Sequence, residues 1–284
     1  MRILKMMLIL ATVTLAAVAC GPKKTTPNGE EKAVPKMLVL YYSQTSNTKA
    51  VATEIATKLG ADIDEIIPVE LYEGDFKATI ERGKKELDEK AYPEIQPLAK
   101  NAADYDVIFL GYPIWFGTFA PPVFTFLNQV DLSGKKIVPF CTFGSGGLES
   151  SLRDLAALEP EAELRPGYGV RAARLEAMPK EIDWFLKANG FIEGEFTKLE
   201  AFPEQHPVSE EEAALFDAAV GDYPMMHAQA KTVASRAIPG GMEYEFTAVD
   251  MPRENMPDMP PAGEMTVYVT ALEGEAPVFT RVIR

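Results

Sequence analysis

Length, composition and charge set the first limits on this chain. It has 284 residues, 47% of them hydrophobic, which is enough to bury a full core and to form one or two domains. The 28 basic residues are outnumbered by 42 acidic ones, for a net charge of −14. Because so acidic a chain repels phosphate backbones and anionic lipid surfaces, we expect no nucleic-acid partner.

Residues 1–19 have the pattern of an export signal. Arg2 and Lys5 precede an apolar run, and small residues lead up to Cys20. The stretch from Leu15 to Gly21 resembles a bacterial lipobox, in which the thiol of Cys20 is acylated. The resemblance implies an exported lipoprotein on the periplasmic or cell-surface side, held to the membrane only by this lipid. A plain secretory signal and an uncleaved anchor are the alternatives.

The next segment, residues 20–35, is polar and predicts a flexible tether. Cys20 and Cys141 are the two cysteines of the chain. Lipidation of Cys20 would therefore leave no pair for an intramolecular disulfide.

From residue 37 onward, apolar runs of strand length alternate with segments of helical period. The predicted strands are 37–42, 62–69, 106–112, 136–141 and 167–171, and the predicted helices are 47–59, 75–90, 122–130, 149–158 and 179–188. This alternation predicts an α/β fold, with a parallel sheet covered by helices on both faces. Its ligand should bind beyond the carboxyl ends of the strands.

A linker at 194–208 leads to a region with another pattern, residues 209–284. We predict a helix from Ser209 to Val220, with Ser209 as N-cap and Glu212 at the capping-box position. Three predicted strands follow at 243–249, 264–270 and 278–283. This C-terminal module is a small α+β domain and is similar to the cystatin-like fold. Residues 237–241 do not match the inhibitory motif of that fold, so a docking role is expected.

A loop rich in Met and Pro joins the first two strands of the C-terminal module. It holds Met251, Met256 and Met259, each followed by proline. Thioether ligation of Cu(I) is one interpretation. We favour a rigid hairpin loop and predict no metal site.

Three loops leave predicted strands at the edge where a ligand should bind. The first loop is Ser43, Gln44, Thr45, Ser46, Asn47 and Thr48. The second loop is Tyr112, Pro113, Ile114, Trp115, Phe116 and Gly117, after Gly111 and before Thr118. The third loop is Thr142, Phe143, Gly144, Ser145, Gly146 and Gly147, after Cys141.

Each loop suits a different part of one ligand. The hydroxyls and helix-start N–H groups of the first loop suit a phosphate, although an ordinary N-cap is the alternative. A flat aromatic ring could stack on Trp115 or Tyr112 of the second loop. The glycines of the third loop allow backbone N–H groups to approach the polar edge of a heterocycle. Together the loops predict a site for a phosphate joined to a planar ring.

These motifs resemble the flavodoxin family over residues 36–193. The first loop is similar to its Ser/Thr-x-Thr-Gly-x-Thr phosphate pattern, with Ser46 in place of glycine beside Asn47, which tolerates positive φ well. Residues 105–117 resemble its third strand and flavin-stacking loop, and residues 134–142 its fourth strand. The resemblance implies a five-stranded sheet of order 2-1-3-4-5 and non-covalent flavin mononucleotide (FMN).

We therefore expect a low-potential electron carrier outside the cytoplasm, whose acidic surface attracts basic redox partner proteins. An NAD(P)H-dependent FMN or quinone reductase on the same fold is the first alternative, and a flavin-free binding lipoprotein is the second. We predict no catalytic nucleophile. Ser145 lacks the Gly-x-Ser-x-Gly context, and Cys141 is interpreted as a buried strand-end residue.

Overall fold

The computed structural model describes residues 34–221, 223, 226–251 and 263–284. The export signal, Cys20 and all but the last two residues of the tether lie outside these ranges, as do residues 252–262 of the Met-Pro loop. Within the described ranges, no helix combines the length and apolar character needed to cross a membrane. The same ranges contain no cluster of three His, Cys, Asp or Glu side chains placed to hold a metal ion.

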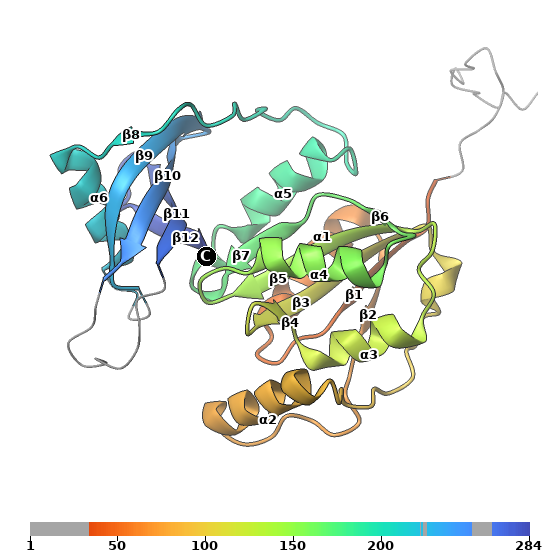
Figure 1. The fold of residues 1–284 in the computed structure, drawn as a ribbon. Coiled ribbons are helices and arrows are strands. Elements are labelled where there is room, and N and C mark those ends of the chain that lie inside the picture. Colours follow the sequence, from red (N-terminus) through yellow and green to blue (C-terminus); the bar gives the residue numbers. More distant parts are fainter. Residues whose placement is uncertain (1–33, 222, 224–225, 252–262) are drawn as a thin grey trace, which may run out of the picture. The chain divides into compact units, whose positions relative to one another are not determined.

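A parallel sheet forms the centre of residues 36–193 (Figure 1). Its strands are β1 (Met37–Tyr41), β2 (Asp62–Glu65), β3 (Val107–Trp115), β5 (Lys136–Phe143), β6 (Glu163–Leu164) and β7 (Tyr168–Arg171). The order is β2-β1-β3-β5, and β5 then pairs with β6 at its start and with β7 at its end. The predicted α/β fold and strand order are therefore confirmed, with the fifth strand split in two.

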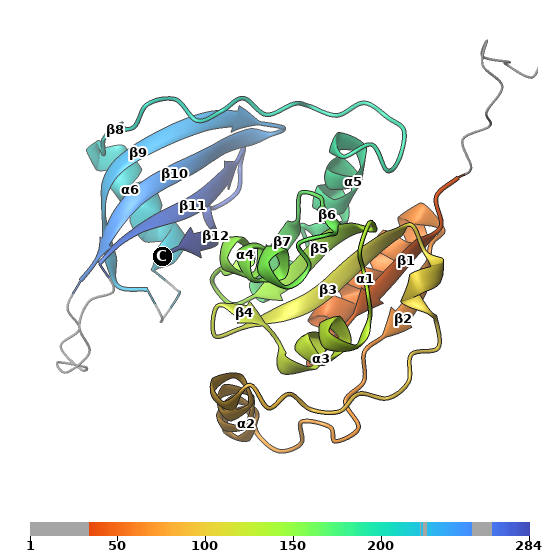
Figure 2. The same cartoon turned by 45° about the vertical axis from the view of Figure 1, so that its right-hand side comes forward.

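Helices cover both faces of this sheet (Figure 2). On one face are α1 (Asn47–Leu59) and α5 (Met178–Ala188), which pack with Val39 and Phe109. On the other are α3 (Pro121–Gln129) and α4 (Leu148–Leu158), which pack with Leu38 and Ile108. Adjacent strand residues point to opposite faces, so burial on both sides explains the unbroken apolar runs.

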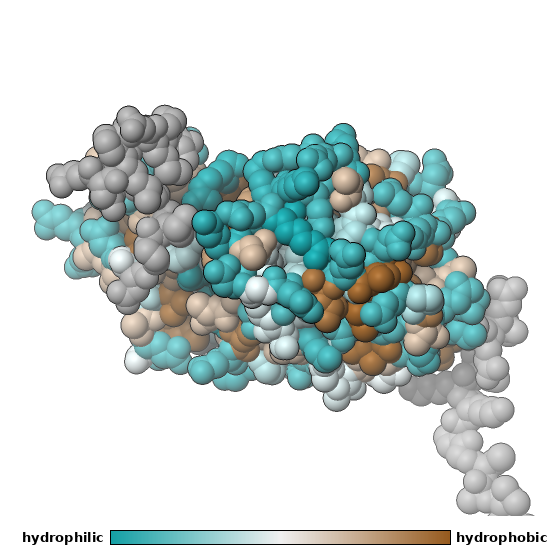
Figure 3. All heavy atoms as spheres, turned by 90° about the horizontal axis from the view of Figure 1, so that it is seen from below, coloured by the Kyte–Doolittle hydropathy of each residue, from teal (hydrophilic) through white to brown (hydrophobic). Residues whose placement is uncertain are grey.

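Shorter elements and α2 complete this body. They are the 3-10 helices Ala102–Asp104 and Ala172–Arg174, the strand β4 (Thr118–Phe119), which pairs with the end of β3, and α2 (Phe76–Glu89). Asp75 caps α2 by accepting a hydrogen bond from the N–H of Ala78. Hydrophilic residues cover much of the face seen from below, with a smaller hydrophobic area among them (Figure 3).

The C-terminal module is an antiparallel sheet of order β12-β11-β10-β9-β8 with one helix. Its elements are β8 (His206–Pro207), α6 (Glu210–Val220), β9 (Ala228–Ile238), β10 (Gly241–Asp250), β11 (Glu264–Leu272) and β12 (Val278–Ile283). Helix α6 packs on the sheet through Phe216, whose ring centroid lies 5.1 Å from that of Phe246. The predicted capping box between Ser209 and Glu212 is confirmed.

Three segments differ from the sequence predictions. Strand β9 was not predicted, because its buried positions include Ala230 and Ala234, which give a weak strand signal. Strand β2 ends at Glu65 rather than at Val69. Strand β8 pairs with β9, so the sheet includes residues that we assigned to the linker at 194–208.

Candidate functional site

The first loop makes a tight turn from β1 into α1. Ser46, the N-cap of α1, has φ 65°, a left-handed conformation that serine seldom adopts. The positive φ therefore falls on Ser46 itself, and Asn47, which we expected to accommodate it, is the first residue of the helix. The side chain of Ser46 makes no capping bond. The N–H of Lys49 donates to Ser43 Oγ at 3.2 Å, and the N–H groups of the first two residues of α1 have no intrahelical acceptor. This turn thus presents N–H donors to an anion.

Two side chains of the first loop are committed to the protein interior. Thr48 is 1% exposed, and its Oγ1 lies 2.9 Å from Oγ1 of Thr142 in the third loop. Gln44 accepts a hydrogen bond from the Tyr42 hydroxyl at 2.7 Å and donates one to the carbonyl oxygen of Tyr72 at 3.0 Å. The side chains of Thr45 and Ser46 are exposed and remain open to a ligand.

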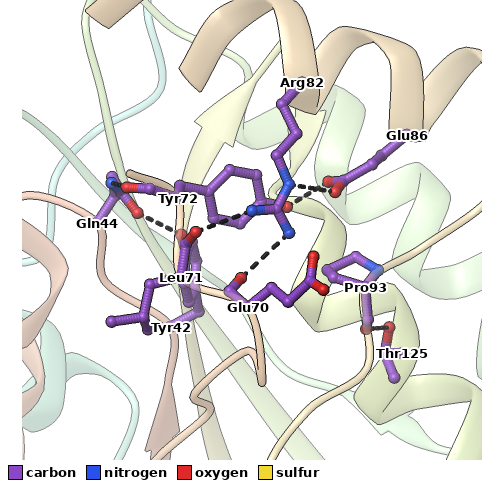
Figure 4. A network of polar contacts seen from close by, with 9 residues as sticks. All are labelled: Tyr42, Gln44, Glu70, Leu71, Tyr72, Arg82, Glu86, Pro93 and Thr125. Atoms are coloured by element: carbon purple, nitrogen blue, oxygen red, sulfur yellow. Dashed lines mark hydrogen bonds and ion pairs between the residues drawn. The ribbon is translucent and has the colours of Figure 1, made fainter. Parts of the chain in front are cut away.

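A polar network centred on Arg82 of α2 holds residues 70–72, the segment that accepts the hydrogen bond of Gln44 (Figure 4). Arg82 donates to the carbonyl oxygens of Leu71 and Glu70 at 2.9 and 3.1 Å, and its Nε lies 2.8 Å from Glu86 Oε1. The Tyr72 hydroxyl donates to Glu86, and burial together with this bond raises the pKa of Tyr72 well above its usual value. The network fixes one side of the first loop.

The second loop is a β-hairpin rather than an irregular loop. Trp115 of β3 pairs with Thr118 of β4, and the two-residue turn between them has φ 53° at Phe116 and φ 85° at Gly117. Two consecutive positive φ values are those of a type I′ turn. A bulky residue rarely takes this conformation. Phe116 is nevertheless 51% exposed, so the hairpin presents an aromatic ring at its tip.

The other two aromatic residues of the second loop pack inward. Tyr112 is fully buried, with its hydroxyl 3.2 Å from Ser151 Oγ, so the expectation that its ring stacks on a ligand is wrong. The Trp115 ring meets the rings of Tyr42 and Tyr72 edge-on, at centroid distances of 6.0 and 5.1 Å. Stacking on Trp115 stays a prediction, and Phe116 is the most exposed ring.

The third loop is shorter than expected. Thr142 and Phe143 belong to β5 and are buried, which leaves Gly144–Gly147 as the connection to α4. A Cβ on Gly147 would lie 2.6 Å from a methyl carbon of Ile114, so this glycine allows the second and third loops to touch. Ser150 of α4 joins them as well, because its hydroxyl reaches the carbonyl oxygens of Gly117 and Gly147.

A pocket of about 460 Å³ opens where the second and third loops meet. It is lined by Ile114, Phe116 and Gly117, by Gly144–Gly147, by Glu149, Ser150 and Arg153 of α4, and by Val282, Ile283 and Arg284 at the end of the chain. Its lining includes no residue of the first loop. The C-terminal residues and Arg153 were not predicted as site residues, and nothing in their local sequence marks them.

Arg171 is a further residue that the sequence analysis missed. It is the last residue of β7, and its Nε donates to the carbonyl oxygen of Gly144 in the third loop at 2.8 Å. Burial lowers the pKa of Arg171, but an arginine stays protonated even so. Its position at the carboxyl end of a strand of the parallel sheet was the available signal.

Cys141 does not take part in any of these contacts. It is fully buried in β5, and burial raises the pKa of its thiol well above the usual value. Because the thiolate is the reactive form, the thiol is held inert. The interpretation of Cys141 as a buried strand-end residue is confirmed.

Comparisons with known proteins bear on residues 36–185, which match the family model described as Flavodoxin. A candidate flavoprotein from Bacteroides eggerthii DSM 20697 is 28% identical, with a TM-score of 0.50 over 55% of this chain and 99% of that one. A flavoprotein from Lactobacillus acidophilus NCFM, solved in complex with FMN, is 23% identical, with a TM-score of 0.45 over 53% and 97% of the two chains. No curated protein matches the chain. These structures thus correspond to about half of the chain.

Proposed function

Because this chain belongs to the flavodoxin family, we propose that it binds FMN at the carboxyl edge of its parallel sheet and carries electrons at low potential outside the cytoplasm. One observation carries the proposal. The strained turn at Ser46, the exposed ring of Phe116 and the glycines of the third loop all follow strands of that edge. A phosphate donor set and a planar-ring surface are thereby brought to one side of the sheet.

The residues present fit the two ends of FMN. The N–H groups of the first two residues of α1 and the hydroxyls of Thr45 and Ser46 would hold the phosphate. The nearest basic side chain along the sequence, Lys49, is paired with Glu65 at 3.1 Å, so backbone dipoles supply most of the attraction. Phe116 and the backbone of Gly144–Gly147 would contact the ring system.

The chain also shapes the redox behaviour of the site. FMN, when bound, supplies reversible electron uptake and release. The net charge of −14 opposes the addition of negative charge and so lowers the potential. The same charge attracts basic partner proteins, at rates that fall as salt rises.

Fluorescence titration of FMN with the purified protein tests the proposal. We expect quenching on binding, and riboflavin, which lacks the phosphate, should bind about tenfold more weakly or worse. Absence of quenching at micromolar protein would overturn FMN binding. Equal affinity for riboflavin would show that the first loop does not hold the phosphate. Rapid turnover of NADH or NADPH by the FMN-loaded protein would favour the reductase over the carrier.

The proposed location rests on residues 1–20, where the lipobox-like stretch ends at Cys20. Growth with radiolabelled palmitate should label the protein in the membrane fraction. The variant Cys20→Ser should lose the label and the membrane association together. A labelled Cys20→Ser protein, or an unlabelled wild type, would contradict lipidation at this residue.

A further inference from the structure

The last strand of the C-terminal module lies against the third loop of the site. The N–H of Val282 in β12 donates to the carbonyl oxygen of Ser145 at 2.8 Å. A Cβ on Gly146 would lie 2.1 Å from the carbonyl oxygen of Val282, closer than any side chain allows. The glycine at 146 therefore permits the backbone of β12 to pass directly over the loop.

Arg171 ties the same two segments together. Its Nε donates to the carbonyl oxygen of Gly144, and its Nη1 donates to that of Phe279 in β12, both at 2.8 Å. The guanidinium lies 4.3 Å from the centroid of the Phe279 ring and 4.9 Å from that of Tyr223. Because the guanidinium is planar and partly buried, it holds both carbonyl groups in one arrangement.

A third contact joins β12 to α4, the helix that follows the loop. Arg281 Nε lies 3.3 Å from Glu149 Oε1, and the guanidinium of Arg281 lies 3.7 Å from the centroid of the Tyr268 ring. Beyond it, Val282, Ile283 and Arg284 line the pocket that also contains Phe116. Residues 282–284 thus form one wall of the pocket without closing it.

We propose that the C-terminal module forms part of the flavin site, with Val282 and Arg171 as positioning residues that hold the third loop in its binding conformation. This inference rests on the proposed binding of FMN. The carbonyl groups of Gly144 and Ser145 are both engaged, so the loop cannot rearrange unless these bonds break. A loop ordered in advance costs less free energy to bind, so the module should slow the release of FMN.

One substitution removes the hydrogen bond between Val282 and Ser145. Strand β12 is an edge strand, and the N–H of Val282 donates to Ser145 rather than to β11. Proline at this position costs the sheet no hydrogen bond, but its ring carbon Cδ replaces the amide hydrogen and pushes against the carbonyl oxygen of Ser145. Val282→Pro therefore deletes the bond to the loop. Val282→Ala is the matched control, since it also shortens this buried side chain but keeps the N–H.

Two measurements apply to each variant, the rate of FMN dissociation and hydrogen exchange across residues 142–148 without FMN. In Val282→Pro we expect exchange to speed up and FMN to dissociate roughly five- to tenfold faster. Val282→Ala, which keeps the N–H, should change both quantities less than Val282→Pro does. If Val282→Pro fails to fold, Arg171→Gln should give the same two changes. Its control is Arg174→Gln, because Arg174 pairs with Glu181 and not with the loop.

The outcomes separate this inference from the function on which it rests. Unchanged FMN dissociation in Val282→Pro and Arg171→Gln, with FMN bound by the wild type, would overturn the inference alone. Faster FMN association and tighter binding in these variants would also overturn it, because the strand would then block the site. If the wild type binds no FMN, the proposed function and this inference both fail.

Discussion

Thr48 and Thr142 share a buried hydrogen bond, 2.9 Å between hydroxyl oxygens, although 94 positions separate them in the sequence. It joins the first turn of α1 to the end of β5, and so the first loop to the third. Neither hydroxyl is exposed enough for a ligand, at 1% and 4%. Their role is to hold the two loops at a constant separation.

Thr142→Val should lower the free energy of unfolding by about 1–3 kcal/mol, because it leaves the Thr48 hydroxyl buried without its partner. The double variant Thr48→Val with Thr142→Val should lose less than the two single changes added together, since no polar group is then left unpaired. Urea denaturation of the four proteins measures this. Strictly additive losses would show that the two hydroxyls are not coupled.

Ser46→Gly should leave the protein unchanged or stabilise it by up to about 1 kcal/mol. Relief of the left-handed strain, about 1–2 kcal/mol, is partly offset by the greater freedom of glycine in the unfolded chain. Ser46→Val should instead destabilise the protein and weaken FMN binding, because a β-branched residue resists φ 65°. Thermal unfolding and FMN titration compare the two. A stabilising valine would contradict the strained turn.

Phe116→Ala and Trp115→Ala should have different effects. Phe116 is half-exposed at the hairpin tip, so its loss should weaken FMN binding by about 1–3 kcal/mol with little effect on stability. Trp115 packs on Tyr42 and Tyr72, so its loss should lower the free energy of unfolding by about 2–4 kcal/mol. FMN titration and urea denaturation of both variants decide this. An unchanged FMN affinity in Phe116→Ala would show that its ring faces away from the cofactor.

Arg153→Gln should lower the midpoint potential of bound FMN. Arg153 lines the pocket, and a positive charge there favours electron uptake against the overall charge of −14. We expect a fall of about 20–40 mV at low ionic strength, shrinking as salt is added. Arg165→Gln is the control. The side chain of Arg165 pairs with Glu163, and its backbone N–H donates to the carbonyl oxygen of Ile137, near the start of β5 and so away from the carboxyl edge of the sheet. Equal shifts in both variants would mean that only net charge matters.

Much of the fold could be predicted because local patterns decided it. The buried runs around Leu38, Ile108 and Ile137 alternate with helical segments, and this alternation predicted a parallel sheet covered on both faces. The order of its strands came from the resemblance to the flavodoxin family. The capping box at Ser209 was equally local. Strand β9 could not be predicted, because alanines at its buried positions gain their burial only from the strands and the helix packed around them.

Part of the candidate site could likewise be predicted from local sequence, and part could not. Its three loops could be predicted from the sequence, because the glycine, aromatic and hydroxyl residues that indicate a ligand site follow directly after predicted strands. The sequence by itself therefore determined the fold class, and it predicted the loops that a phosphate and a planar ring would use. Only the tertiary structure decided which ring is exposed, that Ser46 carries the strained turn, and that Arg171 and Val282 hold the third loop. The physical reason is that burial and long-range hydrogen bonds depend on segments up to 137 positions apart, such as Ser145 and Val282, and no local pattern encodes such a distance.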